Sequence, residues 1–207
     1  MRIVSGDARG IRLTVPEEGE DIRPTEDRVK ESLFSTLGDF TDTAVLDLFS
    51  GTGALGLEAL SRGAARVTMV ERDARHAEVI RRNLAAVRQA IQARGRLPGE
   101  ALLLVAEVAR VPEQLPSVKF DFILADPPYH PADGEYGGRE LLLDERWMNF
   151  CGDRTLLALE HSTDTLDLPW SPRSPWRLLR KRSFGIRSVS FAKRSDNPAV
   201  METEEFV

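Results

Sequence analysis

The sequence predicts an α/β fold built on a mostly parallel sheet that carries helices on both faces. Between residues 44 and 160, short apolar segments typical of buried strands alternate with longer segments whose apolar residues recur at helical spacing. A glycine-rich turn directly follows the first strand-like segment, as it does in doubly wound sheets. Two further strand-like segments, joined around Gly185, predict an antiparallel hairpin that closes the sheet edge.

Each strand and helix is predicted from its own pattern. The apolar runs predict strands at 44–49, 66–71, 102–106, 120–125 and 155–160, with hairpin strands at 176–184 and 186–192. Helical spacing predicts helices at 54–62, 73–93 and 138–150. The long central helix begins at Asp73, a residue type that caps helices, and its apolar side comprises Ala77, Ile80, Leu84, Val87 and Ile91.

The N-terminal region differs in composition from the rest. Residues 3–15 place glycines and arginines between apolar residues, as in a small hairpin, and residues 16–21 form an acidic linker. A helix is expected from about Thr25, with a buried side that comprises Val29, Leu33, Phe34 and Leu37. Residues 92–100 are expected to be an exposed insertion. We therefore expect a hairpin extension and linker at 1–22, one main domain at 23–195 and an acidic tail at 196–207.

The composition limits the possible classes of protein. A chain of 207 residues that is 42% hydrophobic can bury one substantial core. No apolar stretch approaches the roughly 20 residues that span a bilayer, and residues 1–6 lack the apolar core of a signal peptide, so we expect a cytoplasmic protein. Cys151 is the single cysteine and the three histidines are dispersed, so we expect neither a disulfide nor a metal.

Charge gives a second limit. The net charge of −5 argues against a protein that coats nucleic acid through bulk positive charge. Lysine and arginine nevertheless gather between Arg173 and Arg194, where no acidic residue occurs. This basic run is either a phosphate-contacting face or the solvated side of a hairpin.

The glycine turn indicates a nucleoside cofactor. Gly51, Gly53 and Gly56 form a G-x-G-x-x-G pattern between a strand and a helix, and Glu71 follows Gly51 by 20 residues. Such glycines let a ligand approach the backbone, and an acid after the second strand can bind ribose hydroxyls. The pattern alone fits NAD or S-adenosylmethionine, and a turn that merely packs a helix on a strand remains a third interpretation.

Acidic residues near that turn favour the methyl donor. Asp47 lies within the first strand, from where a carboxylate can reach the ammonium group of a zwitterionic ligand through water or the loop. Glu107 is a candidate for the adenine amino group, or an exposed residue at a strand end, in which case Val108 contacts the adenine ring. Phe49 and Arg72, which border the turn and the second strand, complete the expected cofactor site.

The tetrapeptide Asp126-Pro127-Pro128-Tyr129, at the end of an apolar strand, indicates methylation of an exocyclic amine on a base. The lone pair of such an amine is delocalised into the ring. Asp126 and the carbonyl of Pro127 can accept its two N–H groups and draw the nitrogen toward tetrahedral geometry, while proline fixes the carbonyl and adds no donor. Tyr129 offers a flat face for a flipped base. A proline-rich turn after a strand is the structural alternative.

These residues resemble the RsmD family, bacterial methyltransferases that modify guanine N2 in 16S ribosomal RNA. The similarity covers nearly the whole chain and is carried by residues 2–6, 9–10, 23–34 (RPTEDRVKESLF), 46–64, 70–71, 126–129 and 160–161. It implies a Rossmann-like class I methyltransferase core with seven strands, S-adenosylmethionine as cofactor and 16S rRNA as partner. A small-subunit assembly intermediate is a plausible form of the substrate because the chain is acidic.

The resemblance also implies roles for particular residues. Asp126 and Pro127, with Pro128 in the same motif, would hold the guanine amine, Tyr129 would stack on the base, and Glu71 would bind the ribose. Substrate RNA, or the mouth of the cofactor site, would be lined by Arg9, Arg12, Arg23, Thr25 and Arg28; surface charge is the alternative for the arginines. We further expect a monomer without membrane association.

Departures from the family pattern keep other interpretations open. The third strand ends in Ala106-Glu107-Val108 where glycine, aspartate and alanine are more usual, and residues 130–138 form a longer loop that is a candidate cover over the base. The rivals are a DNA adenine or cytosine amino-methyltransferase, an NAD-dependent oxidoreductase and a non-catalytic ribosome-assembly factor.

Overall fold

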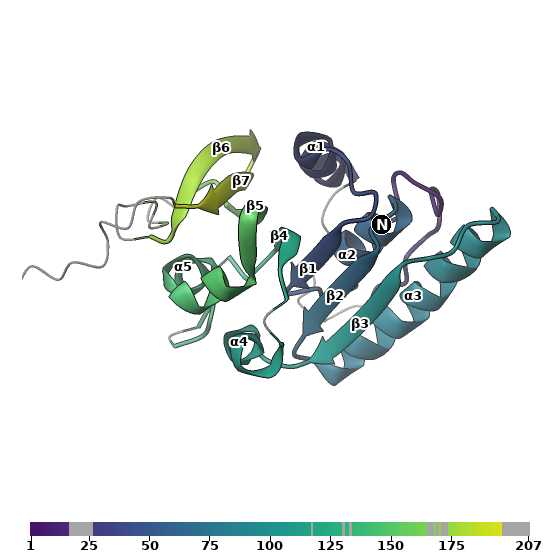
Figure 1. Cartoon of the computed structure of the whole chain (residues 1–207), viewed down its shortest axis with the longest axis horizontal. Helices are drawn as coiled ribbons and strands as arrows, with labels where there is room; N and C mark the ends of the chain where they lie inside the picture. The colour runs from purple at the N-terminus through teal and green to yellow at the C-terminus, as the bar shows by residue number, and fades with distance from the viewer. Residues whose placement is uncertain are drawn as a thin grey trace, which may run out of the picture.

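One twisted sheet organises the molecule (Figure 1). The computed structural model describes residues 1–16, 27–116, 118–129, 131–132, 134–164, 168, 170 and 174–195. Within these residues, seven strands follow the order β3-β2-β1-β4-β5-β7-β6. Their bounds are β1 Ala44–Leu48, β2 Arg66–Glu71, β3 Glu100–Val105, β4 Phe120–Ala125, β5 Cys151–Ser162, β6 Trp176–Phe184 and β7 Arg187–Arg194. Strands β1 to β5 are parallel, and β7 is antiparallel to both β5 and β6. The predicted Rossmann-like, mostly parallel sheet is confirmed.

Helices cover both faces of the sheet. The described helices are α1 Asp27–Leu37, α2 Ala54–Ser61, α3 Ala74–Ala93, α4 Val111–Gln114 and α5 Gly138–Leu143, with 3-10 turns η1 Val108–Arg110 and η2 Glu145–Phe150. Side chains of β1 alternate between two hydrophobic cores, because successive residues of a strand point to opposite faces. Val45 packs with α1, α2 and α3, whereas Leu46 and Leu48 pack with α5 and the 3-10 turns.

Most predicted elements are confirmed to within a few residues, and Asp73 caps α3 by accepting a hydrogen bond from the backbone N–H of Arg75 at 2.8 Å. The single helix predicted at 138–150 is wrong. Asp144 ends α5 and accepts from the backbone N–H of Arg146 at 3.1 Å, which starts the separate turn η2. Strand β5 is longer than predicted because β4 pairs with it at Cys151 and β7 pairs with it as far as Ser162.

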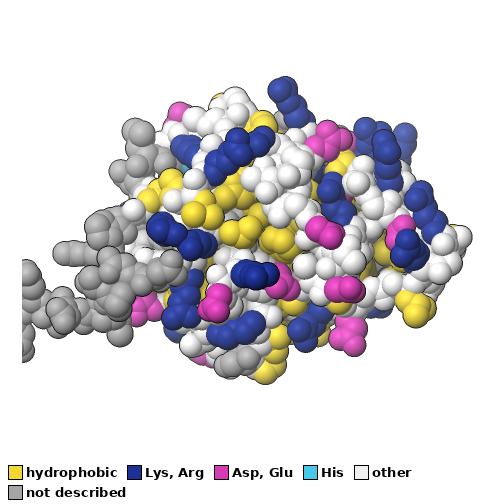
Figure 2. Space-filling view, turned by 45° about the horizontal axis from the view of Figure 1, so that its top comes forward, with side chains coloured by type: hydrophobic (Ala, Val, Ile, Leu, Met, Phe, Trp, Pro, Cys, Tyr) yellow, Lys and Arg dark blue, Asp and Glu magenta, His cyan; other side chains and the backbone are white. Residues whose placement is uncertain are grey.

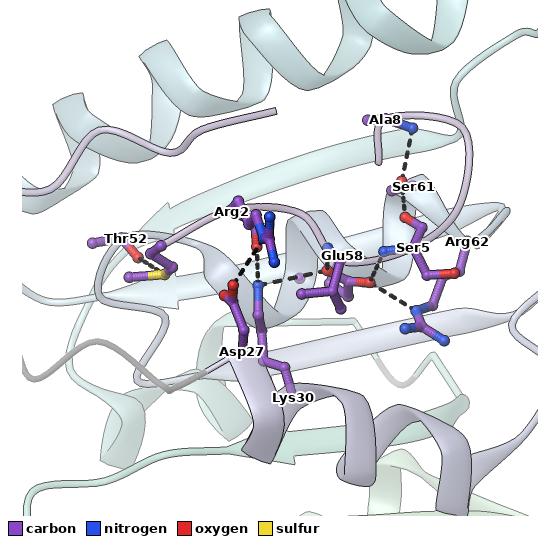
Figure 3. Close-up of polar contacts among 12 residues, drawn as sticks. Arg2, Ser5, Ala8, Asp27, Lys30, Thr52, Glu58, Ser61 and Arg62 are labelled. Atoms are coloured by element: carbon purple, nitrogen blue, oxygen red, sulfur yellow. Dashed lines mark hydrogen bonds and ion pairs between the residues drawn. The ribbon is translucent and has the colours of Figure 1, made fainter. Parts of the chain in front are cut away.

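The N-terminal segment forms the predicted small hairpin, and this hairpin is anchored to the domain. An antiparallel bridge joins Arg2 to Arg12, and the backbone N–H groups of Ile3 and Gly10 donate across the turn to the carbonyls of Ile11 and Ile3, each at 2.9 Å. The hairpin packs on α2, since the buried Glu58 accepts the backbone N–H groups of Val4 at 2.8 Å and Ser5 at 2.9 Å (Figure 3). The predicted helix start at Thr25, and most of the predicted linker at 16–21, lie outside the described residues.

Glu58 is also the centre of a buried charge cluster (Figure 3). Lys30, which is fully buried, places its ammonium 3.5 Å from Glu58 and donates to the carbonyl of Arg2. Arg62 pairs with the other oxygen of Glu58 at 2.9 Å. Burial lowers the pKa of Lys30, and the charge of Glu58 opposes that shift. The cluster therefore ties the N-terminal segment and α1 to α2.

The described residues bear on membrane and metal binding in two ways. None of their helices combines the length and apolar character of a bilayer span. The same residues contain no group of three or more histidine, cysteine, aspartate or glutamate side chains placed to hold a metal ion.

Candidate active site at the carboxyl ends of the strands

A pocket of about 510 Å³ lies where β1, β2 and β4 end. This volume falls within the range of roughly 300–1,000 Å³ that is usual for small-molecule sites. Most of the predicted cofactor and catalytic residues line it, namely Asp47, Phe49, Gly51, Glu71, Arg72, Glu107, Val108, Asp126, Pro127, Pro128 and Tyr129. The structure thus joins the glycine turn and the Asp-Pro-Pro-Tyr motif, which are 70 residues apart in the chain, in one site.

The glycine turn shapes the floor of this pocket. Gly51 and Gly53 adopt positive φ of 56° and 79°, which favour glycine, and Phe49 adopts a φ of 61° that is strained for a bulky side chain. Gly56 is required for packing instead, because a Cβ there would lie 2.9 Å from a carboxylate oxygen of Asp47 and 2.8 Å from Cγ of Met69. Gly53 and Gly56 therefore position the turn without lining the pocket.

Glu71 holds the turn against the end of β2. Its two carboxylate oxygens accept the backbone N–H groups of Gly51 and Asp73, each at 2.8 Å. His76 approaches the same carboxylate, with Nδ1 3.8 Å from Oε1. A carboxylate oxygen has more than one acceptor lone pair, so Glu71 can bind ligand hydroxyls while it keeps these backbone contacts.

Asp47 is a buried acid beneath the turn. Its side chain is 1% exposed and accepts the backbone N–H of Gly56 at 2.9 Å. Burial raises the pKa of Asp47 to about 7; the contact with Gly56 opposes the shift, and the charge of Glu71 adds to it. A cationic group in the pocket would favour the ionised form.

Arg72 links the pocket rim to the loop that follows the Asp-Pro-Pro-Tyr motif. Its guanidinium pairs with Glu135 at 3.1 Å and lies 3.9 Å from Glu107. Glu135 also accepts the backbone N–H of Ala132 at 3.0 Å. In the described part of the loop 130–138, Glu135 and Tyr136 line the pocket, so this segment borders the cofactor region. Its predicted role as a cover over the base stays a prediction.

The Asp-Pro-Pro-Tyr motif leaves β4 directly at the pocket. Asp126 is half-buried and its backbone N–H lies 3.5 Å from the carbonyl of Leu48, next to the glycine turn. Tyr129 donates its hydroxyl to Oε1 of Glu160 at 2.8 Å. Burial and the Glu160 charge raise the pKa of Tyr129. The phenol is therefore a neutral, fixed group whose ring borders the pocket.

Several lining residues were not predicted from the sequence, namely Met1, Ser50, Thr52, Ala54, Leu55, Val70, His76, Glu135, Tyr136 and Arg187. Ser50 and Thr52 belong to the glycine turn and could have been inferred from their position. Tyr136 and Arg187 have no comparable local pattern. The hydroxyl of Tyr136 donates to Asp144 at 2.9 Å and accepts from Trp147 at 2.7 Å, which anchors the loop to η2.

The described arginines that were assigned to RNA do not line the pocket. Arg9, Arg12 and Arg28 are exposed and do not line it, while Arg23 and Thr25 fall outside the described residues. Figure 2 shows basic side chains spread among acidic ones over one face rather than in a single field. Contact of these residues with RNA stays a prediction.

Known proteins resemble this chain over most of its length. A family model described as Conserved hypothetical protein 95 matches residues 1–193. Proteins named ribosomal RNA small subunit methyltransferase D are 33% identical in Haemophilus influenzae, over 91% of either chain, and 33% identical in Escherichia coli, over 89% of this chain and 85% of the relative. A solved Escherichia coli structure, provisionally described as methyltransferase yhhF, is 30% identical with a TM-score of 0.74 and covers 95% of this chain and 99% of its own.

Proposed function

Because this chain belongs to the RsmD family, whose model is described as Conserved hypothetical protein 95, we propose that it is a methyltransferase acting on the small-subunit ribosomal RNA. We further propose S-adenosylmethionine as methyl donor and the exocyclic N2 of one guanine in 16S rRNA as acceptor. The observation that carries the proposal is the meeting of Asp126 to Tyr129 with Asp47 and Glu71 in one pocket.

The acceptor groups of the pocket suit the proposed cofactor. Glu71 would accept hydrogen bonds from the ribose hydroxyls at the end of β2. Asp47, through the turn or a water molecule, would balance the ammonium group, and Val108 and Glu107 border the place for adenine. When bound, S-adenosylmethionine supplies a methyl group attached to a sulfonium, whose sulfur keeps the electron pair of the broken S–C bond.

The catalytic contribution of the chain would be positioning. Asp126 and the carbonyl of Pro127 would accept the two N–H groups of guanine N2 and turn its lone pair toward the methyl carbon. The methylated amine is cationic and acidic, so its proton would pass to Asp126 or to water without a strong base. Tyr129, fixed through Glu160, would support the flipped base.

Other features of the proposal follow from the chemistry of such a substrate. Structured RNA is recognised through shape and exposed bases, and the acidic chain has little bulk attraction for it. We therefore propose an assembly intermediate of the small subunit as substrate, a cytoplasmic location and action as a monomer. The three rivals make different predictions: nicotinamide-cofactor binding for an oxidoreductase, methylated DNA for an amino-methyltransferase of DNA, and RNA binding without transfer for an assembly factor.

Variants at Asp126 test the proposal. Asp126→Ala and Asp126→Asn should lower methyl transfer by at least ~100-fold, since the carboxylate that orients the amine is lost. Binding of S-adenosylmethionine, measured by calorimetry, should change by only a few-fold. Asp153→Asn, an exposed site near the opposite end of β5, is the matched control and should transfer normally. Unchanged turnover in the Asp126 variants would remove Asp126 from the mechanism.

A further inference from the structure

Arg187 enters the pocket from the antiparallel part of the sheet. It is the first residue of β7 and pairs in register with Ser162 at the end of β5 and with Phe184 at the end of β6. Its side chain is 12% exposed and lines the same pocket as Asp126 and Tyr129. A largely buried positive charge therefore lies at the site where the Asp-Pro-Pro-Tyr motif begins.

Glu160 fixes that charge in place. Its side chain is fully buried, and its Oε1 accepts both the hydroxyl of Tyr129 at 2.8 Å and Nη1 of Arg187 at 3.2 Å. A guanidinium carries five N–H donors in one plane, so it can bind a carboxylate on one edge and a different acceptor on another. Arg187 is thus an oriented donor that is coupled, through one carboxylate oxygen, to Tyr129.

We propose that Arg187 selects guanine by donating a hydrogen bond to O6 of the target base. The inference rests on the proposed function, in which guanine N2 is held by Asp126 and Pro127. O6 lies on the same Watson–Crick edge as N2, and arginine to guanine O6 is among the commonest specific contacts between a side chain and a base. Adenine carries an amino donor at the corresponding atom, which cannot accept from Arg187.

The experiment separates recognition of O6 from a general structural role. The modified nucleotide is first mapped. Small-subunit RNA that carries either guanosine or 2-aminopurine riboside at that position is then made by ligation and assembled with the small-subunit proteins into the proposed substrate. 2-Aminopurine keeps the 2-amino group, lacks O6 and carries no hydrogen on N1. Arginine has no acceptor, so Arg187 makes no hydrogen bond with the N1–H of guanosine that this change would remove. kcat/KM for both RNAs is measured with wild-type protein, Arg187→Met, Arg187→Lys and the control Arg180→Met, an exposed residue of β6 that does not line the pocket.

The wild-type protein should prefer guanosine, and Arg187→Met should reduce that preference by roughly 10- to 100-fold, mainly by lowering activity on guanosine. Because both proteins face the same two bases, intrinsic differences in reactivity cancel in the ratio of ratios. Arg187→Lys keeps a charged donor and should retain part of the preference, and Arg180→Met should retain all of it.

An equal loss on both RNAs in Arg187→Met would overturn the inference, because it would indicate that Arg187 only supports Tyr129 or the fold. Wild-type methylation of N2 with an unchanged ratio in Arg187→Met would also refute it while leaving the proposed function intact. Absence of methyl transfer by the wild-type protein would instead refute the function on which the inference depends.

Discussion

Binding of S-adenosylmethionine should depend on the ionisation of Asp47. This acid is fully buried beneath the glycine turn, and its pKa is raised to about 7. If the ammonium group of the ligand is balanced by the carboxylate, the ligand binds the ionised form in preference to the protonated one. Affinity should therefore rise with pH across the range in which Asp47 loses its proton.

The magnitude follows from the pKa of Asp47. With a value of about 7, roughly 3% of the carboxyl is ionised at pH 5.5 and roughly 75% at pH 7.5, so the apparent Kd should fall by about 25-fold over this range. The free energy of unfolding of the ligand-free protein should instead fall as the pH rises. In the folded state the pKa of Asp47 is raised from 3.8 to about 7, so the protonated carboxyl contributes to the free energy of unfolding. This contribution is complete below about pH 4. The contribution is lost as the pH rises through 7, with an upper bound of roughly 4 kcal/mol.

Calorimetric titration at several pH values tests this reasoning. Asp47→Asn keeps an acceptor for Gly56 and loses the charge, so its affinity should be weaker and nearly independent of pH, while the ligand-free variant should melt at a higher temperature than wild type at pH 7.5. His76 also lines the pocket, and its Nδ1 lies 3.8 Å from Oε1 of Glu71. His76→Gln is therefore the control, and its Kd should depend on pH as the wild-type Kd does. A wild-type Kd constant within twofold from pH 5.5 to 7.5, or an equal slope in Asp47→Asn, would refute the account.

Three further substitutions give separate tests. Glu71→Ala should weaken S-adenosylmethionine binding before it affects methyl transfer at saturating cofactor. Undiminished binding by calorimetry would make the ribose assignment wrong. Gly56→Ala should lower the free energy of unfolding by roughly 1–3 kcal/mol in urea titrations, because its Cβ meets Met69; wild-type stability would contradict the close packing. Glu58→Gln should lower it by about 3–5 kcal/mol by leaving the buried Lys30 without a carboxylate, and trypsin should then cleave after Arg9 faster; unchanged values for both would refute the anchoring role.

Features that depend on neighbouring residues could be predicted from the sequence. The strand at Arg66–Glu71, the cap at Asp73 and the glycine turn each follow from short patterns, because helix caps and tight turns are local structures. Doubly wound sheets place strand ends together, so the meeting of Glu71 with Asp126 could also be predicted.

The missed features depend on contacts between distant segments. Arg187 enters the pocket because β7 lies between β5 and β6, an order that composition does not specify. The break at Asp144 depends on its contacts with Arg146 and Tyr136, which outweigh the helical spacing of 138–150. The anchoring of the N-terminal hairpin likewise depends on Glu58, which is more than 50 residues away in the chain.

Transfer of labelled methyl groups tests the central claim most directly. Small ribosomal subunits from cells that lack this gene are incubated with the protein and tritium-labelled S-adenosylmethionine, and the RNA is then digested to nucleosides. We expect the label in N2-methylguanosine, and we expect its loss in Asp126→Ala. Label in another nucleoside would retain a methyltransferase but refute guanine N2 as the target, and no label on subunits, naked rRNA or DNA would contradict the proposed activity.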